Sequence, residues 1–159
     1  MTAMHDALGD AGLGQPLASG HAVAGLVHEH RRFETVVTSP FLAVAFRAWR
    51  CIVQVDQYFQ RSTKVQPGKR FSIQRADGTP MAWAGLWEGH RDSAGTVTRS
   101  YCVITTETNA LLSSVHDRMP VVLEAGNWPV WLGGVEGDAS TLLRPADEGV
   151  QTIRPLTAR

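Results

Sequence analysis

Apolar residues between positions 42 and 49 recur at helical spacing. Leu42, Ala45, Phe46 and Trp49 fall on one face of a helix, directly after the pair Ser39-Pro40. Serine is a favoured residue before the first turn of a helix, and proline is tolerated at its first position. The pattern therefore predicts an amphipathic helix of about ten residues that begins at Pro40.

The rest of the chain is dominated by short apolar runs typical of strands. They lie at residues 50–55, 71–75, 80–87, 97–105, 120–123 and 151–155. Asp77-Gly78 favours a tight hairpin between the second and third runs. One short helix is expected before His116 and another from Asn127 to Trp131, stopped by Gly133-Gly134. These elements predict an α+β fold, with a mainly antiparallel, barrel-like sheet and short flanking helices.

Length and composition indicate one globular domain. The chain has 159 residues, of which 43% are hydrophobic and 19% charged, enough to bury a core of its own. Residues 1–30, rich in Gly, Ala and His, are expected to form a loosely ordered lead-in, and residues 31–159 the domain. No apolar run is long enough to cross a bilayer, and no signal peptide is recognisable, so a cytoplasmic location without a membrane partner is expected.

The two cysteines lie in separate apolar runs, Cys51 in CIVQV and Cys102 in YCVIT. Neither belongs to a C-x-x-C pair, so a disulfide framework or a zinc knuckle is not expected. Buried free thiols are the interpretation that the pattern favours.

The formal net charge is zero, but the charged residues are distributed unevenly along the chain. Residues 31–75 contain nine basic and two acidic side chains, an excess of seven positive charges. Such a segment suggests a surface that faces an anion, phosphate above all. A solvated basic face without a ligand remains the alternative.

A polar cluster near residue 116 is the strongest chemical signal. His116 is followed by Asp117 and Arg118, whose charges can set its protonation, and a histidine titrates near neutral pH. The alternative is a histidine that merely caps the preceding helix. Thr105, Thr106 and Asn109, shortly before it, can orient a substrate or cap the same helix.

Other motifs carry weaker signals. His28-Glu29-His30 has a spacing that metal sites use, but no third ligand follows nearby, so a solvated polar patch is favoured and no metal is expected. Tyr58-Phe59-Gln60 places aromatics beside basic residues, where they can stack on unpaired bases or pack in the core. The GxSxG, HExxH, Walker and GxGxxG motifs are absent, so neither a nucleotide nor another cofactor is expected.

Three segments resemble one known family. They are DGTPMAWAGLWE (Asp77 to Glu88), VITTETNALLSSVHDRMPVVL (Val103 to Leu123) and NWPVWL (Asn127 to Leu132). Upstream, ETVVTSPFLAVAFRAWRCIV (Glu34 to Val53) looks like the same family's E-T helix and the strand after it. With this colinear order over roughly residues 32 to 155, the chain resembles the SOS response-associated peptidase (SRAP) family of abasic-site-processing proteins.

The resemblance implies a DNA-damage function. Family members bind single-stranded DNA that carries an abasic site, and an N-terminal cysteine, exposed by removal of the initiator methionine, closes a thiazolidine ring on the aldehyde. An asparagine, a glutamate and a histidine assist, and an arginine holds the DNA backbone. The same groups are credited with peptidase activity on a propeptide, and a lyase-type reaction also belongs to this chemistry.

Carried over residue by residue, the family pattern is only partly present. His116 matches the family's histidine, and Arg32 matches its DNA-binding arginine. His30 stands where the asparagine is expected, and Gln60 where the glutamate is expected. Glutamine keeps the shape and hydrogen bonding of glutamate but cannot titrate. The candidate catalytic positions are therefore His116, Gln60 and His30, and the candidate DNA contacts are Arg32, Arg61 and Arg118.

Position 2 holds Thr2 rather than cysteine, and the family's N-terminal strands are largely missing. A hydroxyl closes a far less stable ring than a thiol, so covalent crosslinking is expected to be weak or absent. Two alternatives stay open at this point. One is a non-catalytic scaffold that binds DNA or protein, and the other is a truncated gene product whose intact version begins upstream.

Overall fold

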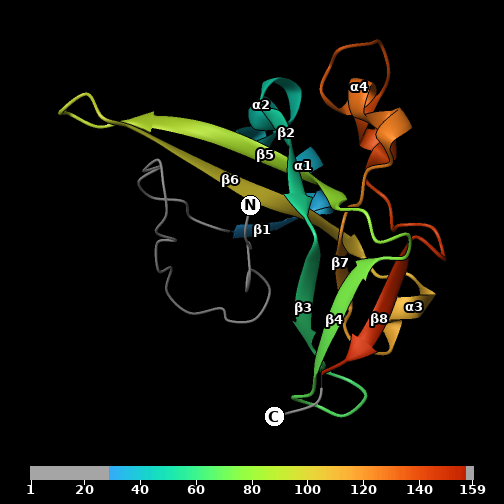
Figure 1. Ribbon diagram of the computed structural model, residues 1–159. Helices are drawn as coiled ribbons and strands as arrows, with labels where there is room; N and C mark the ends of the chain where they lie inside the picture. Colours follow the sequence, from blue (N-terminus) through green and yellow to red (C-terminus); the bar gives the residue numbers. More distant parts are fainter. Residues whose placement is uncertain (1–28, 157–159) are drawn as a thin grey trace.

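The computed structural model describes residues 29–156, which form two sheets with short helices around them (Figure 1). In the larger sheet, sheet A, the strand order is β1-β6-β5-β2, with β7 also paired to β6. The smaller sheet, sheet B, has the order β3-β4-β8. The strands are β1 (Glu29–Arg32), β2 (Arg50–Val55), β3 (Gln57–Arg61), β4 (Arg70–Arg75), β5 (Met81–Arg91), β6 (Val97–Glu107), β7 (Arg118–Pro120) and β8 (Gln151–Pro155).

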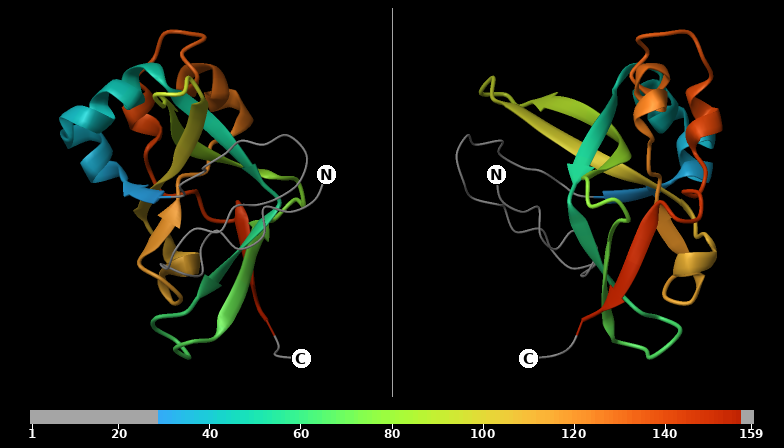
Figure 2. Two further views of the ribbon diagram at one scale, coloured as in Figure 1. Left: turned by 90° about the vertical axis from the view of Figure 1, so that its left-hand side faces the viewer. Right: turned by 45° about the vertical axis from the view of Figure 1, so that its right-hand side comes forward.

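The helices are short, and three of them cover one face of sheet A. They are α1 (Phe33–Thr38), α2 (Pro40–Ala48), α3 (Ala110–Ser113) and α4 (Trp128–Trp131), with 3-10 turns at Ala125–Asn127 and Ala139–Leu142. Figure 2 shows α1, α2 and α4 on this side of the sheet, whereas α3 contacts β8 of sheet B. The helix predicted from the apolar pattern is confirmed as α2, with Pro40 in its first turn, and α1 is the helix of the E-T segment that the family resemblance implied. None of the described helices is long and apolar enough to cross a membrane.

Strand β5 is the centre of the fold, and its alternating side chains serve two cores. Ala84 and Leu86 belong to the core between sheet A and the helices, together with Trp131 of α4. Met81 and Trp83 belong to the core shared with sheet B, since side chains of a strand alternate between its faces. Residues 81–86 are all buried. A strand buried on both faces takes a central place in its sheet.

The chain passes directly from one sheet to the other between β2 and β3. Asp56 is the exposed bend that separates the two strands, which Figure 1 shows as a nearly continuous ribbon. Beyond this bend, Tyr58 is 5% exposed and contacts Trp83 edge-on, with ring centroids 5.1 Å apart. The core interpretation is therefore confirmed for Tyr58.

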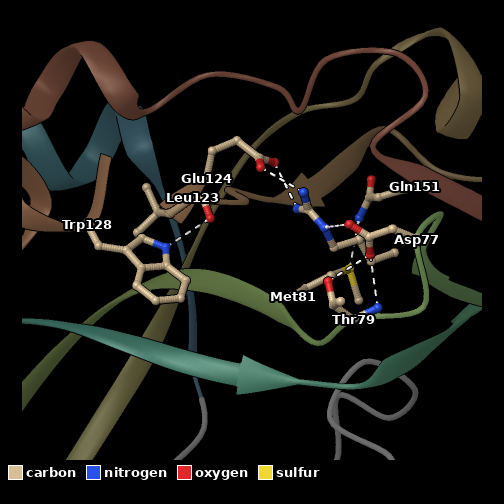
Figure 3. Close-up of polar contacts among 8 residues, drawn as sticks. Asp77, Thr79, Met81, Leu123, Glu124, Trp128 and Gln151 are labelled. Atoms are coloured by element: carbon tan, nitrogen blue, oxygen red, sulfur yellow. Dashed lines mark hydrogen bonds and ion pairs between the residues drawn. The ribbon is translucent and has the colours of Figure 1, made fainter. Parts of the chain in front are cut away.

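The hairpin expected at Asp77-Gly78 is wrong, although the turn itself forms. Gly78 has a φ of 77°, and its N–H donates to the carbonyl of Arg75 at 3.2 Å. However, β4 pairs with β3 and β8, and β5 pairs with β2 and β6. Arg75, at the end of β4, stabilises the turn, because its guanidinium donates to Asp77 in the turn and to both carboxylate oxygens of Glu124 (Figure 3). The buried first half of β5, residues 81–86, thus lies in the sheet that can cover both of its faces.

The predicted α+β class, with mostly antiparallel strands and short helices, is confirmed. Over residues 29–156 the strands form two open sheets and do not close into a barrel. Sheet A ends at β1, which pairs with β6 in parallel, and at β2. Because β2 continues into sheet B rather than meeting β1, no closure occurs.

Candidate functional site

Three segments that are distant in the sequence meet at the C-terminal end of β6. On one edge of β6, β1 pairs in register so that Arg32 lies opposite Thr105. On the other edge, β7 places Arg118 opposite Glu107 and Pro120 opposite Thr105. The β1 segment, with His30 and Arg32, and the strand that follows His116 therefore lie on the two edges of β6 at this end.

His116 is held by the backbone of the segment that follows it. The N–H of Arg118 donates to Nδ1 of His116 at 3.0 Å, and the carbonyl oxygen of Arg118 lies 3.2 Å from the same nitrogen. An N–H can donate only to a bare ring nitrogen, so this bond places the proton of the neutral imidazole on Nε2. The ring is thereby positioned through its Nδ1 side.

The short helix before His116 is fixed independently. Oδ1 of Asn109 accepts from the N–H of Leu112 at 3.2 Å, and its Nδ2 donates to the carbonyl of Ala146 at 3.1 Å. Asn109 is thus the N-cap of α3, as the capping interpretation held. Thr105 and Thr106 are both buried in β6.

Arg118 connects this loop to α1. Its guanidinium donates to both carboxylate oxygens of Glu34, at 2.9 and 3.1 Å, and to the carbonyl of Thr105 at 2.7 Å. The Arg118 hydrogen bonds are the main reason that the pKa of the Glu34 carboxyl is lowered. The Arg118 side chain is only 21% exposed. Arg118 is predicted to contact DNA, but in this structure its guanidinium is bonded to Glu34 and to the carbonyl of Thr105.

The end of β3 is tied to the other side of the His116 loop. The N–H groups of Thr63 and Val65 donate to the carbonyls of Val115 and Ser114, at 3.0 and 3.2 Å. Lys64 forms an ion pair with Asp117 at 2.6 Å, and this cation lowers the pKa of the Asp117 carboxyl. Asp117 is thus paired with Lys64, which lies on this neighbouring loop.

Gln60 is placed just before this junction, on a half-buried position of β3. Its Nε2 donates to the carbonyl of Arg61 at 3.2 Å. Arg61 and Arg32 are both exposed. The loop that follows Gln60 and Arg61 therefore contacts the segment that carries His116, and Arg32 lies across β6 from the strand after that segment.

Several predicted positions lie outside what the structure describes. His28 and Thr2 precede the first described residue, and for His30 only the backbone is placed, opposite Val103. Within residues 29–156, no three His, Cys, Asp or Glu side chains gather as a metal site would require.

Both cysteines are free, as predicted, but half-buried rather than buried. Burial raises the pKa of the Cys51 thiol to about 11, with a further contribution from Cys102. Since the thiolate is the nucleophilic form, Cys51 is a poor nucleophile at neutral pH.

The basic segment is not one continuous surface. Arg50 donates to the carbonyl oxygens of Trp131 and Phe46, and Arg75 is paired with Glu124. These two cations stabilise the fold. Sequence reasoning missed the Glu34–Arg118 pair, because its members are separated by 84 positions. The only available signal was the E-T motif, which did not reveal its partner.

Comparison with known proteins identifies the family. The sequence model for "SOS response associated peptidase (SRAP)" matches residues 21–159. The chain is 30% identical over 121 residues to the "Abasic site processing protein YoqW" of Bacillus subtilis (strain 168), covering 73% of this chain and 54% of that protein. It is 30% identical over 109 residues to the "Abasic site processing protein YMR114C" of Saccharomyces cerevisiae, covering 67% of this chain and 27% of that protein. The chain thus spans about half the length of the Bacillus relative.

Solved structures have the same fold. A crystal structure of a Bordetella bronchiseptica protein superimposes with a TM-score of 0.71 at 25% identity, covering 81% of this chain and 65% of that one. A Bacteroides thetaiotaomicron protein superimposes with a TM-score of 0.73 at 24% identity, covering 80% of this chain and 58% of that one. The second likeness concerns the fold alone. On the match of the family model, this chain belongs to the SOS response associated peptidase family.

Proposed function

We propose that the chain acts in the response to DNA damage by binding single-stranded DNA at abasic sites, with weak or no covalent chemistry. What supports this proposal is that Arg32 on β1 and the strand after His116 flank the end of β6, while the loop that follows Gln60 and Arg61 is hydrogen-bonded to residues 114 and 115. Relatives at 30% identity are named for abasic site processing, which supports the same substrate. The weakened chemistry follows from the residues at the site.

His116 is the proton-transfer group of this site. Its Nε2, which carries the proton in the neutral ring, is the nitrogen left for a substrate once Nδ1 is bonded to the backbone. Gln60 contributes hydrogen bonds to a bound sugar but exchanges no proton, because an amide does not titrate in this range. One half of a general acid and base pair is therefore missing, and His30 replaces an uncharged amide with a titratable ring.

The cysteines at positions 51 and 102 do not supply the nucleophile. Each lies inside a strand of sheet A, half-buried and without a neighbouring free amine. A thiazolidine needs a thiol and an amine on adjacent carbons. These two thiols accordingly leave an abasic aldehyde unmodified.

Arg32 and Arg61 are the proposed phosphate contacts, since both side chains are exposed on either side of the His116 loop. Arg118 contributes through Glu34 and Thr105, by holding the loop in place. If Glu34 releases it, Arg118 adds a third cation to the same surface.

We expect Arg32→Ala to weaken binding of a 20-nucleotide single strand with one central abasic site by roughly five- to tenfold. Loss of one phosphate contact should also reduce the salt slope, d log K/d log[salt], by about 0.7. Fluorescence anisotropy over a range of salt concentrations measures both. The matched control is Arg99→Ala, an exposed strand arginine on the β5–β6 hairpin. Equal losses in the two variants, or binding by the wild-type protein that is independent of salt, would contradict the proposal.

A further inference from the structure

Two exposed tryptophans lie side by side on sheet A. Trp49, directly before β2, is 39% exposed, and Trp87 of β5 is 38% exposed. Their ring centroids are 6.3 Å apart, with the ring planes at 43°. Single apolar residues on a surface are ordinary, whereas adjoining large ones mark a place where a ligand or partner binds. Trp49 and Trp87 are hereafter the tryptophan pair.

Backbone hydrogen bonds fix the positions of the tryptophan pair. The N–H of Trp87 donates to the carbonyl of Trp49 at 2.9 Å, which continues the β2–β5 pairing one residue beyond Arg50 and Leu86. On its other edge, Trp87 is directly opposite Tyr101 of β6. The two indole rings are therefore carried by the sheet itself. A ligand can bind them without first ordering a loop, which would reduce affinity.

The tryptophan pair lies on the same face of sheet A as the candidate site. Leu86 packs against the helices, so Trp87, the next residue of β5, points to the opposite face. Tyr101, opposite Trp87, packs against the core shared with sheet B, in agreement with this direction. Four residues further along β6 on this face is Thr105, which is paired with Arg32. Four residues of a strand span about 13 Å, a distance that a few nucleotides cover.

The surface beside Trp87 is open on the side away from the candidate site. The neighbours of Trp87 on this face of β5 are Gly85 and Gly89, two residues before and after it. Apart from its chain neighbours, an added Cβ at Gly89 would meet one described atom within 4 Å, a methyl carbon of Val97 at 3.9 Å. At Gly85 the corresponding space is filled by the Sγ of Cys51. A planar ring can therefore lie beside the indole of Trp87, over Gly89.

We propose that the tryptophan pair is a platform on which bases of single-stranded nucleic acid stack, a few nucleotides from the candidate site. This inference rests on the proposed function. Unpaired bases stack on aromatic rings with little regard to sequence, because every base has a π-face. A strand held at Arg32 that runs along this face of β6 and β5 brings its bases to the pair. The platform contacts bases and leaves the phosphates in solvent, so it adds affinity without an ion pair.

Two nine-nucleotide strands test the proposal on the full chain. One has a central abasic site with bases on both sides, and the other has the same phosphates and no base at all. Trp87→Ala should weaken binding of the first strand by roughly five- to fiftyfold, as expected for the loss of stacking on one base. The salt slope should stay unchanged, because no cation is removed. Binding of the second strand should remain within about twofold of wild type, since it has no base to stack.

Three further variants separate stacking from a structural effect. Trp49→Ala should act in the same direction as Trp87→Ala. Trp87→Phe keeps an aromatic ring and should bind the first strand within about threefold of wild type. The matched control is Trp128→Ala, which removes an equally exposed tryptophan from α4 on the helix side of sheet A and should alter the binding of neither strand. Circular dichroism identifies the variants that are folded before binding is measured.

Each remaining outcome counts against the inference. If Trp87→Ala binds the first strand as tightly as the wild-type protein, the tryptophan pair is not part of the DNA path, while the proposed function stands. If Trp87→Ala weakens the binding of both strands by the same factor, the ring supports the sheet as a cross-strand aromatic pair and does not stack on bases. If the wild-type protein binds neither strand, the proposed function fails and the inference with it.

Discussion

Trp131→Ala should lower the free energy of unfolding by about 3–5 kcal/mol, the range for loss of a large aromatic side chain from a core. Trp131 is fully buried in α4, where its ring meets Phe46 edge-on with centroids 5.9 Å apart. Its indole N–H donates to the carbonyl of Cys51 at 2.8 Å, so the same side chain joins α4 to β2. Alanine leaves both a cavity and an unpaired carbonyl. Chemical denaturation followed by fluorescence and circular dichroism measures the change.

The neighbouring Trp128 is a matched control in the same short helix. It is 41% exposed, and its indole N–H donates to the carbonyl of Leu123 at 3.2 Å (Figure 3). Trp128→Ala should therefore cost at most about 1–2 kcal/mol, mainly the lost hydrogen bond and partial burial. Equal costs for the two tryptophans would contradict the described packing of α4.

Gly85→Val should destabilise the protein by about 1–3 kcal/mol through overpacking. Gly85 lies in β5 at the point where β2 and β6 approach from both sides. An added Cβ would lie 2.9 Å from the Sγ of Cys51, 3.1 Å from a methyl carbon of Val53 and 3.2 Å from the carbonyl oxygen of Cys102. The backbone carbonyl cannot move without disturbing the β5–β6 ladder. Because β6 and β2 lead to the His116 loop and to Gln60, the strain reaches the candidate site.

Gly126→Val serves as the control for this substitution, since an added Cβ there meets no atom within 4 Å. Its effect should stay within about 0.5 kcal/mol, as for other surface changes. The denaturation midpoints of the two valine variants show whether the substitution at Gly85 costs more stability than the one at Gly126. A Gly85→Val protein as stable as the Gly126→Val protein would show that the three central strands do not approach as closely as described.

Local sequence signals predicted those elements whose formation depends on local pattern. The helix that begins at Pro40 and the strands at residues 50–55 and 151–155 formed with nearly the expected bounds. Asp77-Gly78 correctly predicted a turn but not which strands pair. Pairing depends on burial of both faces of β5, a property of the whole sheet that a two-residue turn signal does not contain.

The candidate site could be predicted only residue by residue. The family motif points to His116, Arg32 and the altered Gln60, and the contacts of His116 and Gln60 are local, but the contacts that hold the surrounding loops cross long sequence distances. Arg118 pairs with Glu34, and Lys64 pairs with Asp117, through loops that no periodicity brings together.

The central claim is that this chain binds an abasic site in single-stranded DNA without forming a durable covalent bond. The most direct test incubates the protein with a labelled strand that carries one abasic site, then divides the sample between a native and a denaturing gel. We predict a shifted band on the native gel, weakened as salt rises, and free oligonucleotide after denaturation. A shifted band that survives heating in denaturant, or no complex under native conditions at low salt, would contradict the account.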